Sequence, residues 1–308
     1  MKRREFLHRT AAASSLAMVS SGSLFGAAKG FRFAICNESM KGMSWSEQCA
    51  LAASAGYSGI EIAPFTLVKE GVREIDAQQR KAMRRALKDN GLRCAGLHWL
   101  LVAPPAGLHC TTSDDAVRNR TWDYIGDLID FCADMEAEVM VFGSPKQRSA
   151  KDAGISVAEA IKRLQDGLAR VAPHAKRSGV KILLESLDHT QTDVINNLAQ
   201  TLEVIKQVNH PSIQTMFDFH KTADETEPFD LLIRKYYPYI HHVHVQEMDG
   251  KYMGTGTGST AYVKALQTLK DLKYQKWVSL EVFDFTPGAR TIAEQSLKTL
   301  KAMQAGLR

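Results

Sequence analysis

Eight short apolar segments rich in β-branched residues alternate with longer amphipathic segments, and this alternation constrains the fold more than any other feature of the chain. The apolar segments span residues 31–37, 58–64, 92–99, 138–144, 180–186, 213–219, 239–245 and 276–283. Their length and composition predict buried strands, and the periodic segments between them predict helices. Strict alternation of the two predicts parallel βαβ units.

Parallel βαβ units can close into a barrel or form an open, doubly wound sheet. The chain has 308 residues, and no G-x-G-x-x-G motif follows its first apolar segment. Single barrels commonly reach this length, and dinucleotide-binding doubly wound sheets carry that glycine motif. We therefore predict an α/β protein with one (β/α)8 TIM barrel over residues 29–308, and we find no linker that would divide it.

The first 28 residues predict an export signal. Arg3 and Arg4 precede a weakly apolar run, and small residues end the segment at Ala28. This pattern resembles a twin-arginine signal peptide, so residues 1–28 predict export to the periplasm. The alternative is a membrane anchor or an ordinary N-terminal helix. The run is too short and too rich in Ser, Gly and Ala for a stable membrane span.

The charge and the cysteines exclude several classes of protein. The formal net charge is +5, and three of these charges come from residues 1–28. The rest of the chain has no run of Lys and Arg that would predict binding to nucleic acid or to an anionic membrane. Its five cysteines form no C-x-x-C pair, which disfavours a disulfide framework or a zinc knuckle.

Four acidic or imidazole side chains stand at the ends of four consecutive predicted strands: Glu185, Asp218, His244 and Glu281. The carboxyl ends of barrel strands meet at one mouth, where active sites of this fold lie. Charges at the ends of buried strands are costly unless they are paired or coordinated. Together they predict a divalent metal site suited to Mn²⁺, Mg²⁺ or Co²⁺, and less typically to Zn²⁺.

The stretch 239–245 holds three histidines, His241, His242 and His244. In a regular strand, alternate side chains point to the same side. His242 should therefore share the inner face with His244, one layer deeper, as a hydrogen-bonding residue behind the site. The same period predicts that His241 points towards the surrounding helices.

Other polar side chains near the strand ends are weaker candidates. His98 and Trp99 end the third strand and can bind substrate, with the indole against the apolar face of a sugar; the alternative is a structural polar pair. Lys146 and Arg148 can hold a phosphate or carboxylate; the alternative is a solvated basic turn. Polar residues of the first two strands without an assigned role are Asn37, Glu38 and Glu61.

The motifs LLESLDHTQTD, MFDFH, HHVHVQE and KWVSLEVFDF carry a family resemblance. They resemble the xylose-isomerase-like barrel superfamily, and within it the sugar isomerase/epimerase branch exemplified by D-tagatose 3-epimerase. The resemblance covers residues 31–305 and is more specific in the second half of the chain. It implies a sugar or keto-sugar substrate and, often, a dimer or tetramer.

The resemblance also implies roles for the four strand-end residues. Glu185, Asp218, His244 and Glu281 match the metal ligands of the branch, with Mn²⁺ as the first expectation. Glu185 and Glu281 also match its acid/base pair, which removes and returns a proton next to a carbonyl through an enediolate.

Three departures from the branch bear on the particular reaction. The branch commonly has D-x-x-H after the sixth strand, whereas here His220 comes two residues after Asp218. A glutamate six residues after the first ligand is replaced by Gln191. An expected arginine after the seventh strand is absent, and Lys251 is offered instead. We include His220 and Lys251 among the predicted substrate-binding residues.

The principal alternative function is a lyase or dehydratase of the same superfamily, or a keto-glycoside-cleaving enzyme with the same metal site. A non-catalytic sugar-binding protein is a further alternative, disfavoured by the intact ligand quartet. Abasic-site endonucleases share the barrel, but they need more histidines, including one where this chain has Lys251. We therefore expect no nucleic-acid partner.

Overall fold

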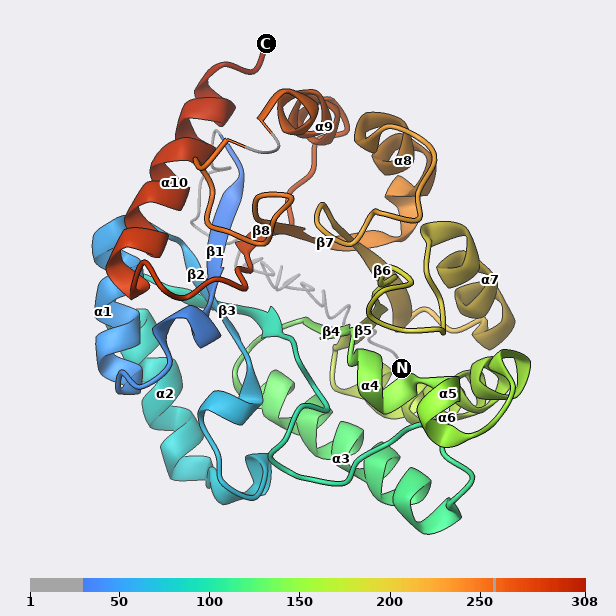
Figure 1. Cartoon of the computed structure of the whole chain (residues 1–308). Coiled ribbons are helices and arrows are strands. Elements are labelled where there is room, and N and C mark those ends of the chain that lie inside the picture. Colours follow the sequence, from blue (N-terminus) through green and yellow to red (C-terminus); the bar gives the residue numbers. More distant parts are fainter. Residues whose placement is uncertain (1–29, 257–258) are drawn as a thin grey trace, which may run out of the picture.

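The protein is a closed barrel of eight parallel strands. The computed structural model describes residues 30–308 except 257–258, so the predicted export signal lies outside the described residues. The strands follow one another around the barrel in chain order, and β1 pairs with β8 to close it (Figure 1). The strands are β1 (Arg32–Cys36), β2 (Gly59–Ile62), β3 (Arg93–Leu97), β4 (Val139–Phe142), β5 (Lys181–Leu184), β6 (Ile213–Asp218), β7 (Ile240–Val245) and β8 (Trp277–Leu280).

Helices form an outer ring around these strands (Figure 1). The α-helices are α1 (Trp45–Ala55), α2 (Ala77–Asp89), α3 (Asp115–Asp134), α4 (Pro145–Arg148), α5 (Ala150–Ala153), α6 (Val157–Arg177), α7 (Leu198–Val208), α8 (Phe229–Tyr236), α9 (Ser259–Asp271) and α10 (Ala289–Ala305). Four short 3-10 turns are η1 (Asn37–Met40), η2 (Pro64–Thr66), η3 (Val72–Glu74) and η4 (Tyr237–Tyr239). The predicted (β/α)8 TIM barrel is confirmed.

Local sequence signals set the helix boundaries. At the start of α1, the Ser44 side chain accepts from the backbone N–H of Glu47, whose carboxylate accepts from the Ser44 N–H. This reciprocal cap satisfies donors that the first helical turn leaves free. The helix ends at Gly56, whose φ of 96° belongs to the left-handed region that glycine adopts without strain. Such signals place the connections, and therefore the strand ends, at defined positions.

The buried apolar residues form one large cluster and two small ones. Apolar side chains such as Ile35 and Leu184 fill the space between the strands and the helices. Inside the barrel, Val139, Leu183 and Met216 form a smaller apolar cluster. Ala34, Ala95 and Trp277 form a second small apolar cluster. Nearer the carboxyl ends of β2, β7 and β8, the buried side chains are polar, among them Glu61, His242, His244 and Ser279. The barrel interior is therefore a packed core on one side and a polar network on the other.

An irregularity in β7 changes the prediction for His241. Thr215 of β6 pairs with Ile240, but Phe217 pairs with Val243, so two β7 residues stand opposite Met216. An extra residue of this kind shifts the alternation of side chains. His241 lines a small cavity at the amino-terminal end of the barrel, together with Val139 of the interior. The prediction that His241 points towards the helices is wrong, because the strand period is interrupted there.

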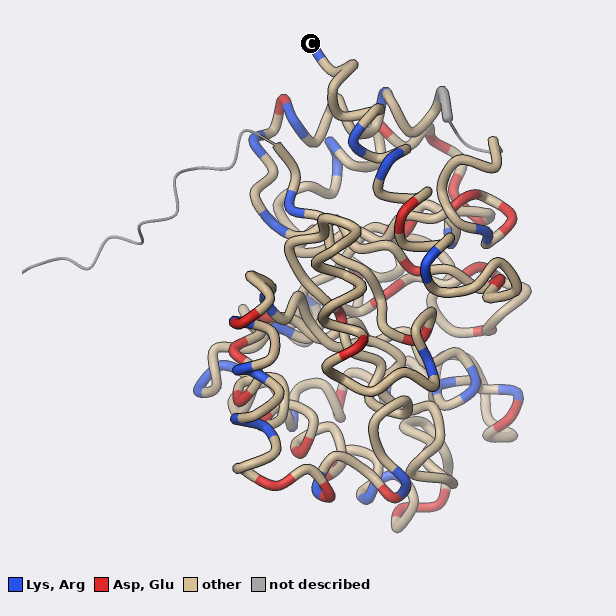
Figure 2. The backbone as a smooth tube through the Cα atoms, turned by 90° about the vertical axis from the view of Figure 1, so that its left-hand side faces the viewer, with Lys and Arg blue, Asp and Glu red and all other residues tan. Residues whose placement is uncertain are grey.

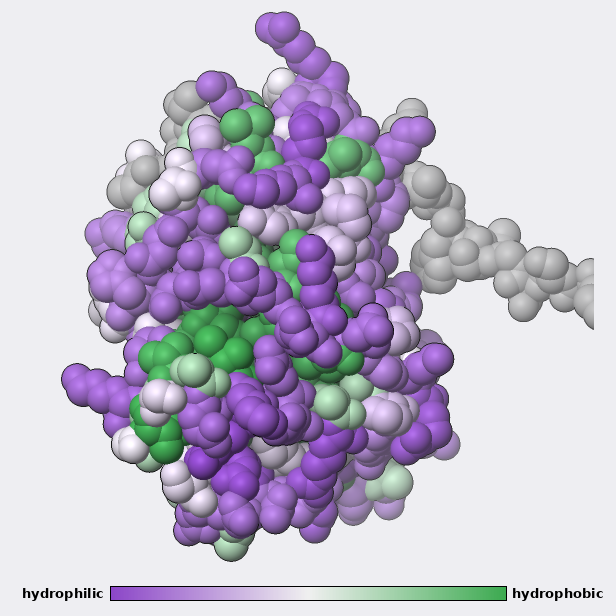
Figure 3. Space-filling model, turned by 90° about the vertical axis from the view of Figure 1, so that its right-hand side faces the viewer, coloured by the Kyte–Doolittle hydropathy of each residue, from purple (hydrophilic) through white to green (hydrophobic). Residues whose placement is uncertain are grey.

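The outer surface is mixed in character. Figure 2 shows that Lys and Arg are interspersed with Asp and Glu on the side of the molecule that faces the viewer. On the face shown in Figure 3, hydrophilic residues cover most of the surface and hydrophobic residues gather in smaller patches. Within the described part of the chain, no helix combines the length and apolar character needed to cross a membrane.

Candidate active site

A cavity of about 600 Å³ opens at the carboxyl ends of the strands. It receives side chains from the ends of β3, β5, β6 and β8 and from the loops that follow β4 and β7. Among the residues that line it are His98, Trp99, Lys146, Glu185, Asp188, Gln191, His220, Lys221, Asp249, Glu281 and Phe283. A groove of about 560 Å³ beside η3 and α3 holds none of the strand-end residues. The chemistry suggested by the sequence therefore lies at the strand-end cavity.

The structure brings together the four residues predicted as metal ligands. One potential ligand atom from each of Glu185, Asp218, His244 and Glu281 lies within 4.8 Å of the others. Strand pairing explains the arrangement, because Asp218 stands opposite His244 in the ladder between β6 and β7. Glu281 extends β8, where its backbone N–H donates to the carbonyl oxygen of Val245 at 3.3 Å.

The atoms of this quartet fit a divalent cation. Nδ1 of His244 and Oδ2 of Asp218 are buried and have no hydrogen-bond partner within the described structure. Three carboxylates with one imidazole form a ligand set that hard and borderline divalent metals accept. Two other groups that include Cys36 are less suitable, because their imidazole and carboxylate atoms already bond each other: Glu38 with His98, and Glu61 with His244.

Burial and mutual repulsion perturb the carboxylates of the quartet. Burial first, and then Glu281 and Asp218, raise the pKa of Glu185 to about 8. Burial also acts to raise the pKa of Glu281, but His244 and His98 hold it well below its usual range. The pKa values of the two glutamates differ because Nδ1 of His244 lies only 3.2 Å from Oε2 of Glu281. Without a cation, the site must therefore retain protons to limit repulsion between its carboxylates.

Glu61 connects the quartet to the deeper interior of the barrel. Its carboxylate is fully buried, with Oε1 3.1 Å from Nε2 of His244 and Oε2 2.7 Å from Nε2 of His242. Burial acts to raise the pKa of Glu61, but His242 and His244 hold it well below its usual range. A carboxylate in this position keeps the proton on Nε2 of His244 and leaves Nδ1 free for a metal. Sequence reasoning noted Glu61 without assigning this role, and it placed His242 correctly as a hydrogen-bonding residue behind the site.

His98 and Trp99 both line the cavity. Nε2 of His98 lies 2.9 Å from Oε2 of Glu38, and both side chains are almost completely buried. The indole N–H of Trp99 donates to Oε1 of Glu281 at 2.6 Å, and its ring stacks on Phe283 with centroids 6.2 Å apart. Trp99 has a φ of 53°, an uncommon conformation for a bulky residue. The local backbone thus directs the indole towards a predicted acid/base residue.

The segment after β6 contains a residue that the sequence analysis missed. His220 lines the cavity as predicted, and so does Lys221, which follows Asp218 by three positions. Lys221 is only 6% exposed. Its Nζ donates to Oε1 of Gln191 at 2.9 Å. The D-x-x-H spacing points to position 221, where this chain has a lysine in place of the histidine.

Two of the predicted substrate-binding cations do not line the cavity. Arg148 is fully buried, and its guanidinium donates to the backbone oxygens of Glu185 at 2.9 Å and Ile195 at 3.4 Å. Lys251 pairs with Asp249, with 2.8 Å between Nζ and Oδ2, and only Asp249 lines the cavity. Lys146 does line the cavity. Arg148 is therefore a support for the end of β5, because its donors are directed at main-chain carbonyls.

Replacement of Arg148 by methionine is expected to lower the free energy of unfolding by about 2–4 kcal/mol, because it leaves buried carbonyl oxygens without a charged donor. Urea unfolding of the purified variant measures this. Arg85→Met, at an exposed arginine, is the matched control and should change stability by less than about 0.5 kcal/mol. A loss below about 1 kcal/mol for Arg148→Met would contradict the supporting role.

Comparisons with known proteins agree with this fold. Residues 49–303 match the family model described as xylose isomerase-like TIM barrel. A probable ketose 3-epimerase from Synechocystis sp. is 25% identical over 237 residues, covering 75% of each chain. The crystal structure of a D-psicose 3-epimerase in the presence of D-fructose matches with a TM-score of 0.76 and 18% identity, over 90% of this chain and all of that one. A 3-keto-D-glucoside 4-epimerase from E. coli matches with a TM-score of 0.74 and 18% identity, over 88% of this chain and 99% of that one. The chain therefore belongs to the xylose isomerase-like TIM barrel family.

Proposed function

We propose that this protein is a metal-dependent sugar epimerase or isomerase that abstracts a proton from a carbon next to a carbonyl group. The observation that carries the proposal is the buried quartet of Glu185, Asp218, His244 and Glu281, which adjoins one cavity. The names of relatives support the substrate class, since a probable ketose 3-epimerase aligns over three quarters of the chain.

The side chains of the cavity can perform each part of such a reaction. A divalent cation held by the quartet, for which we propose Mn²⁺, would supply Lewis acidity that makes the proton next to a carbonyl easier to remove. Glu185 and Glu281 both reach the cavity, so one can remove a proton and the other can return it. The Trp99 indole and Phe283 form an aromatic wall suited to the apolar face of a sugar ring.

A second candidate is a lyase or a keto-glycoside-cleaving enzyme that begins with the same proton abstraction. It is favoured by the residues beside the quartet, where Gln191 and Lys221 replace the glutamate and histidine that the epimerase branch carries at these positions. The two candidates share the first step and differ in the product.

The decisive experiment is exchange of solvent deuterium into a panel of ketoses and keto-glycosides by the Mn²⁺-loaded protein. Incorporation at the carbon next to the carbonyl, followed by mass spectrometry and NMR, identifies both the substrate and the site of proton abstraction. An epimer of the substrate as product supports the first candidate, and an eliminated fragment supports the second. Exchange into no member of the panel would contradict both.

Metal binding is expected to strengthen as the pH rises towards 8. In the metal-free protein the raised pKa of Glu185, about 8, means that this group is mostly protonated at pH 7. Burial acts to lower the pKa of His244, but Glu61 and Glu281 hold it well above its usual range. A metal needs both groups deprotonated, so its uptake below pH 8 should release about one to two protons. Calorimetric Mn²⁺ titrations at pH 6, 7 and 8, in buffers of different ionisation enthalpy, measure this; equal affinities at pH 6 and pH 8 would contradict it.

We also propose that residues 1–28 direct export to the periplasm through the twin-arginine route. Expression of the full chain with Arg3 and Arg4 both replaced by lysine tests this, with cell fractionation as the measurement. Retention of the double variant in the cytoplasm, while the unmodified chain reaches the periplasm, is the expected result. Equal distribution of the two forms would contradict it.

A further inference from the structure

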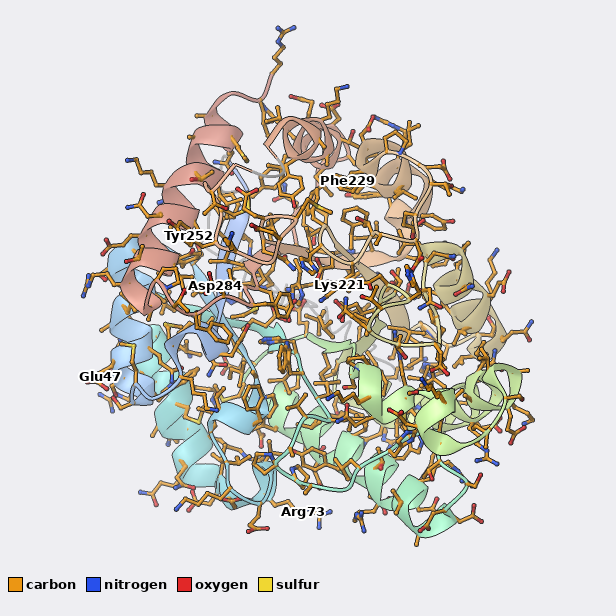
Figure 4. The ribbon with its side chains drawn as sticks, in the orientation of Figure 1. Glu47, Arg73, Lys221, Phe229, Tyr252 and Asp284 are labelled. Atoms are coloured by element: carbon orange, nitrogen blue, oxygen red, sulfur yellow. The ribbon has the colours of Figure 1, made fainter. Side chains whose placement is uncertain are left out.

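Lys221 is a buried lysine that makes no close ion pair, although its charge acts on the carboxylates of Glu185, Asp218 and Glu281. Its side chain lies near the centre of the barrel mouth (Figure 4) and lines the cavity, while the residue is only 6% exposed. Across the described part of the chain, its Nζ forms no ion pair within 4.0 Å of a carboxylate oxygen. Its contacts are the amide oxygen of Gln191 at 2.9 Å and the ring of Phe283, whose centroid is 4.1 Å from Nζ.

These contacts leave most of the binding capacity of the ammonium group unused. A lysine ammonium carries three N–H donors, and one of them is directed at Gln191. The Phe283 ring offers a weak cation–π contact. A buried charge is normally paired, because removing it from water is costly. The free donors of Lys221 therefore lack a partner that a ligand in the cavity can provide.

Gln191 is built to orient Lys221 without neutralising it. Its Nε2 donates to Oδ2 of Asp188, and the other oxygen of that carboxylate, Oδ1, accepts from the Thr190 hydroxyl. The amide oxygen of Gln191 is thereby turned towards Lys221. A glutamate at position 191 could accept the same hydrogen bond from Lys221, but it would cancel the positive charge and replace the donor to Asp188 with a second carboxylate. An amide preserves that charge for the contents of the cavity.

We propose that Lys221, held by Gln191, binds a negatively charged oxygen of the substrate beside the metal quartet; this rests on the proposed function. Two sources of that oxygen share this chemistry. One is the oxygen of a neutral ketose on which negative charge develops as the enediolate forms, and preorganised donors stabilise such an oxyanion strongly. The other is the permanent carboxylate of a keto-sugar acid.

The test compares wild-type protein with Lys221→Gln, Lys221→Arg and Gln191→Glu, all loaded with Mn²⁺. D-Fructose and D-fructuronate are the probes, since they differ only in a hydroxymethyl or a carboxylate group. Solvent deuterium exchange gives kcat and KM. When exchange is absent, intrinsic tryptophan fluorescence, to which the cavity residue Trp99 contributes, reports binding. The matched control is Lys276→Gln, which removes a half-buried lysine at the opposite end of the barrel.

If the oxygen is the developing oxyanion, Lys221→Gln should lower kcat on D-fructose about 100- to 1,000-fold while KM changes less than about threefold. If it is a carboxylate, wild type should bind D-fructuronate at least about tenfold more tightly than D-fructose, and Lys221→Gln should remove that difference. In either case Gln191→Glu should change the same parameter in the same direction, and its melting temperature is measured alongside because the variant also loses the donor to Asp188. Lys221→Arg should retain part of the effect, and Lys276→Gln should behave as wild type.

The proposal is overturned if Lys221→Gln leaves kcat, KM and the ratio of the two binding constants within about twofold of wild type. It is also overturned if wild type neither exchanges D-fructose nor binds D-fructuronate. Failure of the proposed function alone gives a different result. In that case D-fructuronate binds tightly and its binding depends on Lys221, but deuterium is exchanged into no ketose.

Discussion

Replacement of Glu185 by glutamine is expected to lower kcat for proton exchange at least about 1,000-fold. The carboxylate is predicted both to hold the cation and to move a proton at the substrate carbon, and general acid/base groups alone contribute about 100- to 10,000-fold. Glutamine keeps the size of the side chain but cannot accept a proton. The measurement is solvent deuterium exchange into the best substrate of the ketose panel, with metal content determined on the same sample. Glu281→Gln should show a loss of similar size.

The matched control is Glu225→Gln, because Glu225 is a glutamate that is partly buried but does not line the cavity. Its Oε1 accepts from the backbone N–H of Leu198, a bond that glutamine preserves. This variant should retain activity within about twofold. Full activity in both Glu185→Gln and Glu281→Gln would contradict the proposed mechanism, whatever the metal content.

Glu61→Gln is expected to raise the dissociation constant for Mn²⁺ about 10- to 100-fold, although Glu61 is not one of the quartet. The carboxylate now accepts from both His242 and His244. An amide can accept from one of these imidazoles only, and its N–H group then faces the other. The Nε2 proton of His244 loses its acceptor, so Nδ1 is no longer reserved for the cation. Calorimetric titration of the metal-free variant measures the change.

Two further variants test whether the effect of Glu61→Gln arises from the loss of its bond to His244. His242→Gln should weaken metal binding less than Glu61→Gln, because it leaves the bond between Glu61 and His244 intact. Glu225→Gln again serves as the control for the same chemical change. A dissociation constant for Glu61→Gln within about threefold of wild type would show that His244 does not depend on Glu61 for its orientation.

The quartet could be predicted from sequence because parallel strands give it a simple signature. Each member follows a short apolar run, and the carboxyl ends of such runs meet at one barrel mouth. Glu185 and Asp218 are far apart in the chain but end neighbouring strands. A regular fold thus turns a pattern in the sequence directly into proximity in space.

Other features could not be predicted in this way. The offset between Thr215 and Phe217 in the pairing of β6 with β7 turned His241 into the barrel, and hydrophobic periodicity carries no signal for one inserted residue. Arg148 follows β4 as a basic residue of an apparent surface turn, yet its guanidinium is buried against main-chain oxygens. Lys221 is brought to Gln191 by two separate loops.

The sequence by itself determined the (β/α)8 architecture and the membership of the quartet, because both depend on the order and periodicity of residues along single strands. The tertiary structure decided which polar side chains behind and beside the quartet act on it. Glu61 reaches His242 and His244 across the barrel interior, and Gln191 meets Lys221 between two loops. These contacts depend on side-chain direction and on the packing of distant segments, which local patterns do not encode.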